Sequence, residues 1–141
     1  MEDDLKRAIL MDHYKMPHNR GLKQDPRYVS VHNASESCID DITVQMLIED
    51  NIIKDVCYDG TGCTICIASC SIMSDLIKGK SLDEALNIIY NYYNMIDENE
   101  FDIDLLEEAN AFDTLYKQAN RIKCGTIGIH SIEQVLDKYE K

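Results

Sequence analysis

The stretch YDGTGCTICIASC, Tyr58 to Cys70, marks the point where the chain changes from strand to helix. Before it, apolar residues alternate with polar ones from residue 42 onward, which is the period of a half-buried strand. After its second glycine, the apolar residues follow helical spacing from residue 63 to residue 78. Strands first and helices afterwards predict an α+β domain whose helices pack on one face of the sheet.

The first half of the chain predicts a small three-stranded antiparallel sheet. A short alternation at residues 29–31 is the first expected strand, and residues 42–48 form the second. The residues EDN turn the chain, and residues 52–58 are expected to be the hairpin partner. A helix over residues 4–14, with Pro17 beyond its end, precedes the sheet.

Further helices are predicted after the strands. Ser81-Leu-Asp-Glu84 has the pattern of a capping box and opens a helix that extends to about Met95. Asp104-Leu-Leu-Glu107 is a looser match, with aspartate at the cap position, and the last helix begins near Cys124. Because neither a linker nor a repeat separates these elements, residues 1–141 are expected to form a single domain.

The composition excludes several classes of function. A formal net charge of -12 argues against a nucleic-acid partner, because an acidic surface repels phosphates. No apolar run approaches the roughly 18 residues that a membrane-spanning helix needs, and the acidic start is unlike a signal peptide. We therefore expect a cytoplasmic protein without a membrane partner. In that compartment thiols stay reduced, so six cysteines indicate metal or sulfur chemistry before disulfides.

Three cysteines are expected to pack in the interior. Cys66 and Cys70 lie on an apolar helical stripe and Cys57 alternates within a strand, and free cysteine behaves as a small hydrophobe. A thioredoxin-type redox pair, Cys63-x-x-Cys66, is a rival, but it belongs in a βαβ unit that a hairpin does not supply. A cubane cluster on Cys63, Cys66 and Cys70 is disfavoured, because three ligands on one straight helix cannot easily surround it.

The other cysteines stand at the ends of predicted elements. Cys63 follows a strand exit with two glycines and sits at a helix N-terminus, where free amides and the helix dipole stabilise a thiolate. Cys38 lies in a turn two residues before Asp40, and Cys124 lies where a loop enters the last helix. If these ends converge, three thiolates and one carboxylate form a tetrahedral set of the kind that zinc takes. The alternative is that cysteines stand at three element ends by chance.

The four histidines have no ligand-like spacing to one another. His13 is expected to have a structural or partner-facing role rather than to bind metal. His18 and His32 lie in loops, and His130 lies on the last helix.

Five motifs together resemble the IscU/NifU-like family over nearly the whole chain. In order they are MDHYKMPHNRG (11–21), the Cys38-x-Asp40 turn, GTGCTICIAS (60–69), IKGKSL (77–82) and RIKC (121–124). Within that family the chain resembles the SufU branch, which has an extra segment before the last cysteine, here about residues 97–119. The IscU branch instead has a histidine before that cysteine and an LPPVK-like motif, whereas Lys123 precedes Cys124 here and the proline pair is missing.

The resemblance implies a fold of the IscU/SufU type, a zinc site and an activity. SufU-like proteins hold zinc through three cysteines and an aspartate, which match Cys38, Asp40, Cys63 and Cys124. They are zinc-dependent sulfurtransferases that accept persulfide sulfur from a SufS-type cysteine desulfurase, a pyridoxal-phosphate enzyme, and pass it toward iron–sulfur cluster assembly. A downstream iron–sulfur scaffold is a second candidate partner. Cys38 is the expected sulfur acceptor, and Arg121 is expected to pair with the desulfurase or steady the site.

Two other functions stay open at this point. The same four ligands suit a scaffold on which a [2Fe-2S] cluster is assembled and transferred, or a structural zinc module that only binds a partner. The family's usual Cys-Gly-Asp is also Cys-Ile-Asp here, and SES stands where Asn-Pro is usual. Because glycine allows a positive φ that isoleucine resists, a lower zinc affinity or a different ligand mix is a further alternative.

Overall fold

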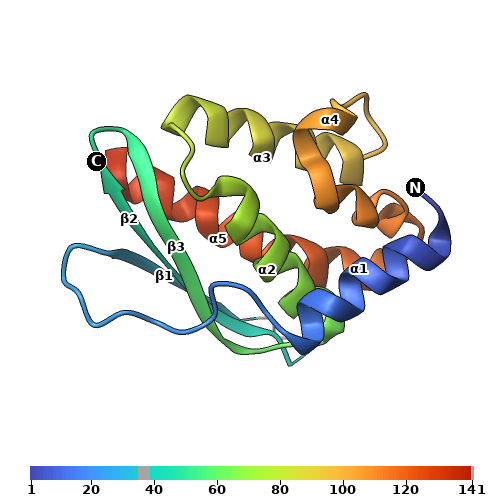
Figure 1. Ribbon diagram of the computed structural model, residues 1–141, viewed down its shortest axis with the longest axis horizontal. Helices are drawn as coiled ribbons and strands as arrows, with labels where there is room; N and C mark the ends of the chain where they lie inside the picture. The colour runs from blue at the N-terminus through green and yellow to red at the C-terminus, as the bar shows by residue number, and fades with distance from the viewer. Residues whose placement is uncertain (35–38, 141) are drawn as a thin grey trace.

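The chain forms a three-stranded antiparallel sheet with helices against one face (Figure 1). The computed structural model describes residues 1–34 and 39–140. This arrangement confirms the predicted α+β class and the three-stranded sheet. The described elements are α1 (Asp3–Lys15), β1 (Val29–Ala34), β2 (Asp41–Glu49), β3 (Ile52–Thr61), α2 (Thr64–Ile77), α3 (Leu82–Ile96), α4 (Ile103–Leu106), the 3-10 turns η1 (Glu107–Phe112), η2 (Leu115–Lys117) and η3 (Ala119–Arg121), and α5 (Ile122–Glu140).

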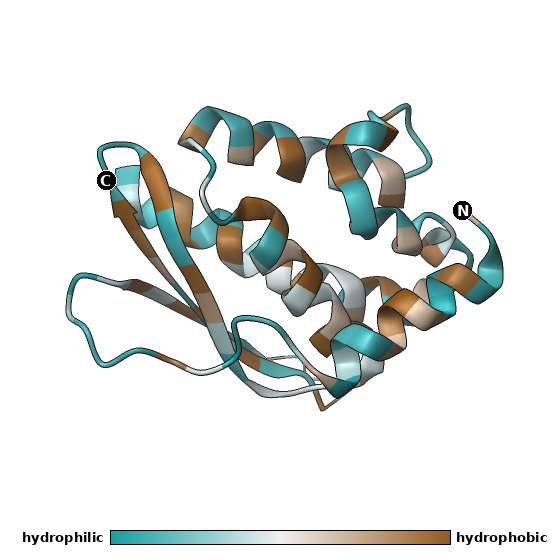
Figure 2. Ribbon diagram, in the orientation of Figure 1, coloured by the Kyte–Doolittle hydropathy of each residue, from teal (hydrophilic) through white to brown (hydrophobic). Residues whose placement is uncertain are grey.

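The sheet follows the alternating pattern of its sequence. The strand order is β1-β2-β3, with Val44 of β2 opposite Val31 of β1 and Tyr58 of β3. The hairpin between β2 and β3 turns at Asp50 and Asn51, both with positive φ, as a tight hairpin turn requires. Hydrophobic and hydrophilic colours alternate along the strands in Figure 2. The buried residues of β2 are every second one: Ile42, Val44, Met46 and Ile48.

The segment between α1 and β1 runs beside β3. The Gly21 N–H donates to the Tyr58 carbonyl at 2.7 Å, and the Tyr58 N–H donates to the Asn19 carbonyl at 3.3 Å.

Cys57 is 2% exposed, and its Sγ lies 3.3 Å from Oε1 of Gln45. Cys57 is therefore buried, as predicted, although it packs beside Gln45 rather than with the main core. Burial raises the pKa of its thiol, which keeps it protonated.

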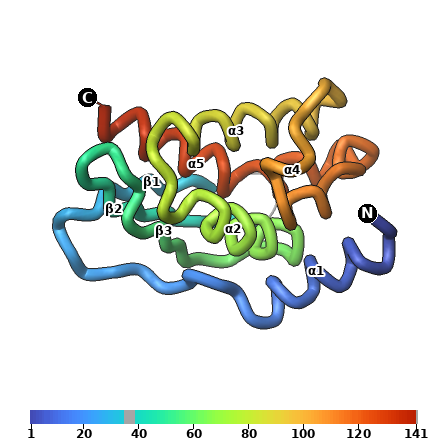
Figure 3. Tube along the Cα trace, turned by 45° about the horizontal axis from the view of Figure 1, so that its top comes forward, coloured from blue at the N-terminus to red at the C-terminus, as the bar shows by residue number. Residues whose placement is uncertain are grey.

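Helix α2 lies at the centre of the molecule. It contacts α1 on one side and α5 on the other, and α3 and α1 lie on opposite sides of it (Figure 3). Cys66 and Cys70 are 0% and 3% exposed and belong to the core, as their apolar stripe predicted. A hydrogen bond with Cys70, together with burial, raises the pKa of the Cys66 thiol, so both side chains serve packing.

Helix α5 is amphipathic, and its apolar face covers β1 and β2. Ile132, Val135 and Leu136 are buried on that face, whereas His130 is exposed. The carbonyl of Gly125 accepts hydrogen bonds from Tyr92 Oη and Ser69 Oγ, which tie α3 and α2 to α5. Among the helices that the structure describes, none is both long and apolar enough to cross a membrane.

The predicted cap at Asp104 is wrong, because the helix begins earlier and lasts only one turn. Asp102 is the cap residue of α4, and its Oδ1 accepts the Asp104 N–H at 3.1 Å. The Asp102 N–H in turn donates to Oδ1 of Asn91 on α3 at 2.8 Å, a contact that no local pattern reveals. A positive φ of 45° at Glu107 ends the helix, and 3-10 turns lead to α5.

The capping box at the start of α3 is confirmed and supports a stability prediction. Ser81 Oγ accepts the Glu84 N–H at 3.2 Å, and Glu84 Oε1 accepts the Ser81 N–H at 3.0 Å. Ser81→Ala removes the first bond, and we expect it to lower the free energy of unfolding by about 1 kcal/mol. Urea denaturation measures this loss. Asp83→Ala, at an exposed position of the same turn, is the control; a Ser81 variant no less stable than this control contradicts the prediction.

Candidate metal centre

Three element ends converge on the side chains of Asp40, Cys63 and Cys124. Asp40 directly precedes β2, Cys63 is the N-cap residue of α2, and Cys124 lies in the first turn of α5. One carboxylate oxygen of Asp40 and the two Sγ atoms lie within 4.8 Å of one another. The fourth predicted ligand, Cys38, lies outside the described residues, two positions before Asp40. The structure thus brings together the three predicted ligands that it describes.

Two glycines allow the close approach of strand exit and helix start. Gly60 has a φ of +138°, and a Cβ there would collide with the Asp41 carbonyl of the neighbouring strand. A Cβ on Gly62 would lie 2.7 Å from Sγ of Cys66 and 3.2 Å from Oδ1 of Asp40. Glycine at both positions therefore lets Cys63 come close to the Asp40 carboxylate.

Asp40 points inward, and among the described residues only one of its two carboxylate oxygens has a hydrogen-bond partner. Its side chain is 1% exposed, and Oδ1 accepts the Cys63 N–H at 3.0 Å. Oδ2 is buried and has no partner among the described residues. A buried carboxylate oxygen without a partner is costly, and a bound cation removes that cost. Ile39 stands where the family usually has glycine. Its side chain is 68% exposed, while the side chain of Asp40 beside it is buried.

The two thiols complete a donor set that fits a soft or borderline metal ion. Cys63 is half-buried and its side chain makes no capping hydrogen bond, so its Sγ is available. Burial raises the pKa of the Cys124 thiol, and the adjacent Asp40 and Cys63 raise it further. A positive charge beside Cys124 therefore favours the thiolate form of this residue. Thiolates with one carboxylate are ligands that zinc accepts, so the residues present fit this ion.

Two exposed basic residues, Arg121 and Lys123, come just before Cys124 in the chain. Arg121 ends η3, directly before α5, and both side chains are exposed. They stand three residues and one residue before Cys124 along the chain. The approach to Cys124 along this segment therefore carries two positive charges.

Two histidines without a ligand-like spacing in the sequence lie together in the structure. The imidazole rings of His13 and His18 lie 4.6 Å apart between centroids, beside Asp75. His13 is 4% exposed and makes structural contacts with Ser71 and Glu108. These partners lie 58 and 95 residues away along the chain, so no local spacing signals the cluster. His32 and His130 instead pair with single surface carboxylates.

Comparisons with known proteins agree on one family. The model of the NifU-like N terminal domain matches residues 6–141. The chain is 34% identical to the zinc-dependent sulfurtransferase SufU of Bacillus subtilis, over 98% of this chain and 93% of that protein. It is 31% identical to the iron-sulfur cluster assembly scaffold protein IscU of Streptococcus pyogenes, over 93% and 82%.

A solved structure from Fervidobacterium islandicum supports the same fold. That protein, FiSufU, is described as an iron-sulfur cluster assembly scaffold for the SUF system. It superposes with a TM-score of 0.82 at 29% identity and covers 91% of this chain and 93% of its own. The relatives therefore include both a named sulfurtransferase and named scaffolds.

Proposed function

The chain belongs to the family of the NifU-like N-terminal domain, and from that membership we propose that it serves iron–sulfur cluster assembly as a zinc-dependent sulfurtransferase. The resemblance to SufU over 98% of the chain supports this choice. The proposed partner is a cysteine desulfurase of the SufS type, which supplies sulfur as a persulfide on its own cysteine.

The single observation that carries the proposal is the orphaned oxygen of Asp40. Oδ2 is buried and has no partner within the described part of the chain, and one oxygen of the same carboxylate lies within 4.8 Å of two thiols. We propose that Asp40, Cys63, Cys124 and Cys38 hold a zinc ion, which when bound keeps the thiols ionised. One ligand atom from each of Asp40, Cys63 and Cys124 lies within 4.8 Å of the other two.

The proposed reaction is a displacement at sulfur. The Cys38 thiolate attacks the outer sulfur of the partner's persulfide, a new S–S bond forms, and the old one breaks. The partner's cysteine leaves as a thiolate, and Cys38 carries the sulfur onward as a persulfide. The outer sulfur atom passes from the partner's cysteine to Cys38, and one thiolate replaces the other. Neither an oxidant nor a reductant is therefore consumed.

The remaining residues of the site have distinct proposed tasks. Cys63 and Cys124 are anchored at the starts of α2 and α5, so they retain their position while Cys38 reacts. Asp40 is held through Oδ1 by the Cys63 N–H, and its buried Oδ2 has no partner among the described residues and is proposed as the oxygen that binds the ion. We assign Arg121 to the encounter with the desulfurase, because it is exposed close to Cys124 and attracts the anionic outer sulfur of a persulfide.

A second candidate function is assembly of a [2Fe-2S] cluster on the same ligands. The 31% identity to an IscU scaffold across 93% of this chain favours it, as does the scaffold description of FiSufU. Lys123, in place of a histidine before Cys124, favours the first candidate instead.

Metal and sulfide analysis of the protein purified without oxygen separates the two functions. The sulfurtransferase proposal expects about one zinc per chain in a colourless sample, from the four-ligand closed site. Iron with inorganic sulfide in a brown sample would reject it in favour of the scaffold. The visible spectrum and elemental content should be recorded on the same sample before any reconstitution.

A further inference from the structure

A second group of metal-type ligands lies toward the other end of α2. One nitrogen each of His13 and His18 and a carboxylate oxygen of Asp75 lie within 4.8 Å of one another. Asp75 is twelve residues beyond Cys63, which is roughly 18 Å along a helix at 1.5 Å per residue. The group is therefore separate from the cysteine cluster at the start of α2.

His13 is buried and fixed through both ring nitrogens. Nδ1 lies 2.7 Å from Ser71 Oγ, which also accepts the His18 N–H at 2.8 Å. Nε2 faces Oε1 of Glu108 at 3.3 Å. That separation is longer than the about 2.7–2.9 Å of a good charge-assisted hydrogen bond. It matches the roughly 3.3 Å between two ligands of a tetrahedral zinc ion with bonds of about 2.0–2.1 Å.

His18 and Asp75 face each other with one possible ligand atom each. Nδ1 of His18 lies 2.5 Å from Oδ2 of Asp75, and Asn19 Nδ2 donates to Oδ1 at 2.8 Å. An ion bound here takes the place of the proton between these two atoms, so that Nδ1 of His18 and Oδ2 of Asp75 are both ligands. The His18 and Asp75 side chains are 54% and 42% exposed, so an ion reaches them directly from solvent.

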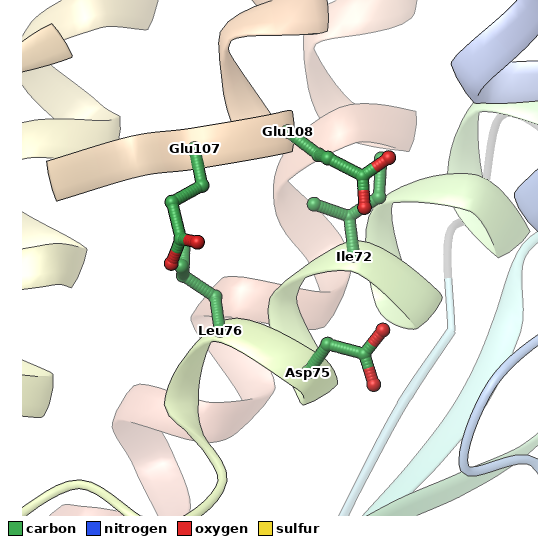
Figure 4. A pocket seen from close by; sticks show the side chains of 5 residues that line it. All are labelled: Ile72, Asp75, Leu76, Glu107 and Glu108. Carbon is green, nitrogen blue, oxygen red and sulfur yellow. The ribbon is translucent and has the colours of Figure 1, made fainter. Parts of the chain in front are cut away.

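An acidic pocket adjoins these ligands (Figure 4). Asp75 enters it from α2, and Glu107 and Glu108 enter it from η1, with Ile72 and Leu76 as its apolar part. Across residues 1–34 and 39–140, the only salt-bridge partners of Asp75 and Glu108 are His18 and His13. Three carboxylates without a lysine or arginine partner concentrate negative potential and attract a cation.

We propose that His13, His18, Asp75 and Glu108 form a second metal site, for a first-row divalent cation such as Zn²⁺. Two imidazoles with carboxylates are a ligand set that this class of ion favours. The ligands come from α1, the loop after it, α2 and η1. A bound ion therefore clamps the N-terminal helix and the segment that leads to Cys124 onto α2, and stabilises the fold by binding it.

Equilibrium dialysis of the full chain against micromolar Zn²⁺ tests the proposal. The wild type should bind two ions per chain, and His18→Ala and Asp75→Asn should each bind one. Cys63→Ser removes the other site and should retain the ion that His18→Ala loses. His130→Ala is the matched control, because His130 is also 54% exposed beside a carboxylate but has no second histidine; it should keep both ions.

The thermal midpoint provides a second readout. Added Zn²⁺ should raise the midpoint of Cys63→Ser but not that of the double variant Cys63→Ser/His18→Ala, because the stabilisation comes from binding at the histidines. Because His18 is more than half exposed, its replacement should leave the circular dichroism spectrum unchanged. Absence of a bound ion from Cys63→Ser, or binding of two ions by His18→Ala, would overturn the proposal. The ion count of His18→Ala reports on the cysteine site alone, so the proposed function is judged separately.

Discussion

Cys38→Ala is expected to reduce the stimulation of a SufS-type cysteine desulfurase to the rate of the desulfurase alone, while the protein stays folded. The acceptor sulfur is the nucleophile of the proposed transfer, and alanine offers no atom that can receive a persulfide sulfur. Alanine formed from cysteine, in the presence of a reductant that releases the sulfur, measures the desulfurase rate. Circular dichroism and the thermal midpoint measure folding on the same samples.

The control for this loss is Cys57→Ala. Cys57 is 2% exposed, packs beside Gln45 away from the cluster, and has a thiol pKa raised by burial. Its replacement should leave the stimulation at the wild-type level. Full stimulation by Cys38→Ala would exclude Cys38 as the acceptor. Full stimulation together with a lower thermal midpoint would instead support a structural zinc module, in which the cysteines only hold the fold.

Much of the fold could be predicted because its signals are local. The alternation along β2 and the capping box at Ser81 each involve residues within a few positions of one another. The prediction of where α4 starts was wrong for the opposite reason. Asp102, rather than Asp104, caps it because the Asp102 N–H is held by Asn91 from another helix. A cap that depends on a tertiary contact has no signature in four consecutive residues.

The two candidate sites differ in the same way. Cys63 and Cys124 stand at helix starts, which the sequence marks, so their approach to Asp40 could be expected. His13 and His18 meet Asp75 only because α1 packs along α2, and no spacing in the sequence reports that packing. The inward turn of Asp40 was equally hidden, because it depends on the hydrogen bond from the Cys63 N–H.

Asp40→Ala is expected to lower the zinc content of the purified protein well below that of the wild type. The substitution removes the buried Oδ2 that lacks a partner in the described structure, and with it the one hard ligand among the thiols. Loss of groups that merely orient a ligand costs roughly ten- to a hundredfold in metal affinity, and loss of a ligand costs at least as much. Competition with a chromogenic chelator measures the affinity, and elemental analysis gives the occupancy.

Asp40→Asn separates the two roles of this side chain. The amide oxygen of asparagine can still accept the Cys63 N–H, as Oδ1 does at 3.0 Å, but the side chain carries no charge. Without metal, we expect the asparagine variant to have a higher thermal midpoint than the alanine variant. Its zinc affinity should fall nearly as far as that of the alanine variant. Asp41→Ala is the control, since that neighbouring carboxylate is 56% exposed and pairs with His32. Wild-type zinc affinity in both Asp40 variants would mean that the cysteines bind the ion without this carboxylate, and that its burial serves the start of α2 alone.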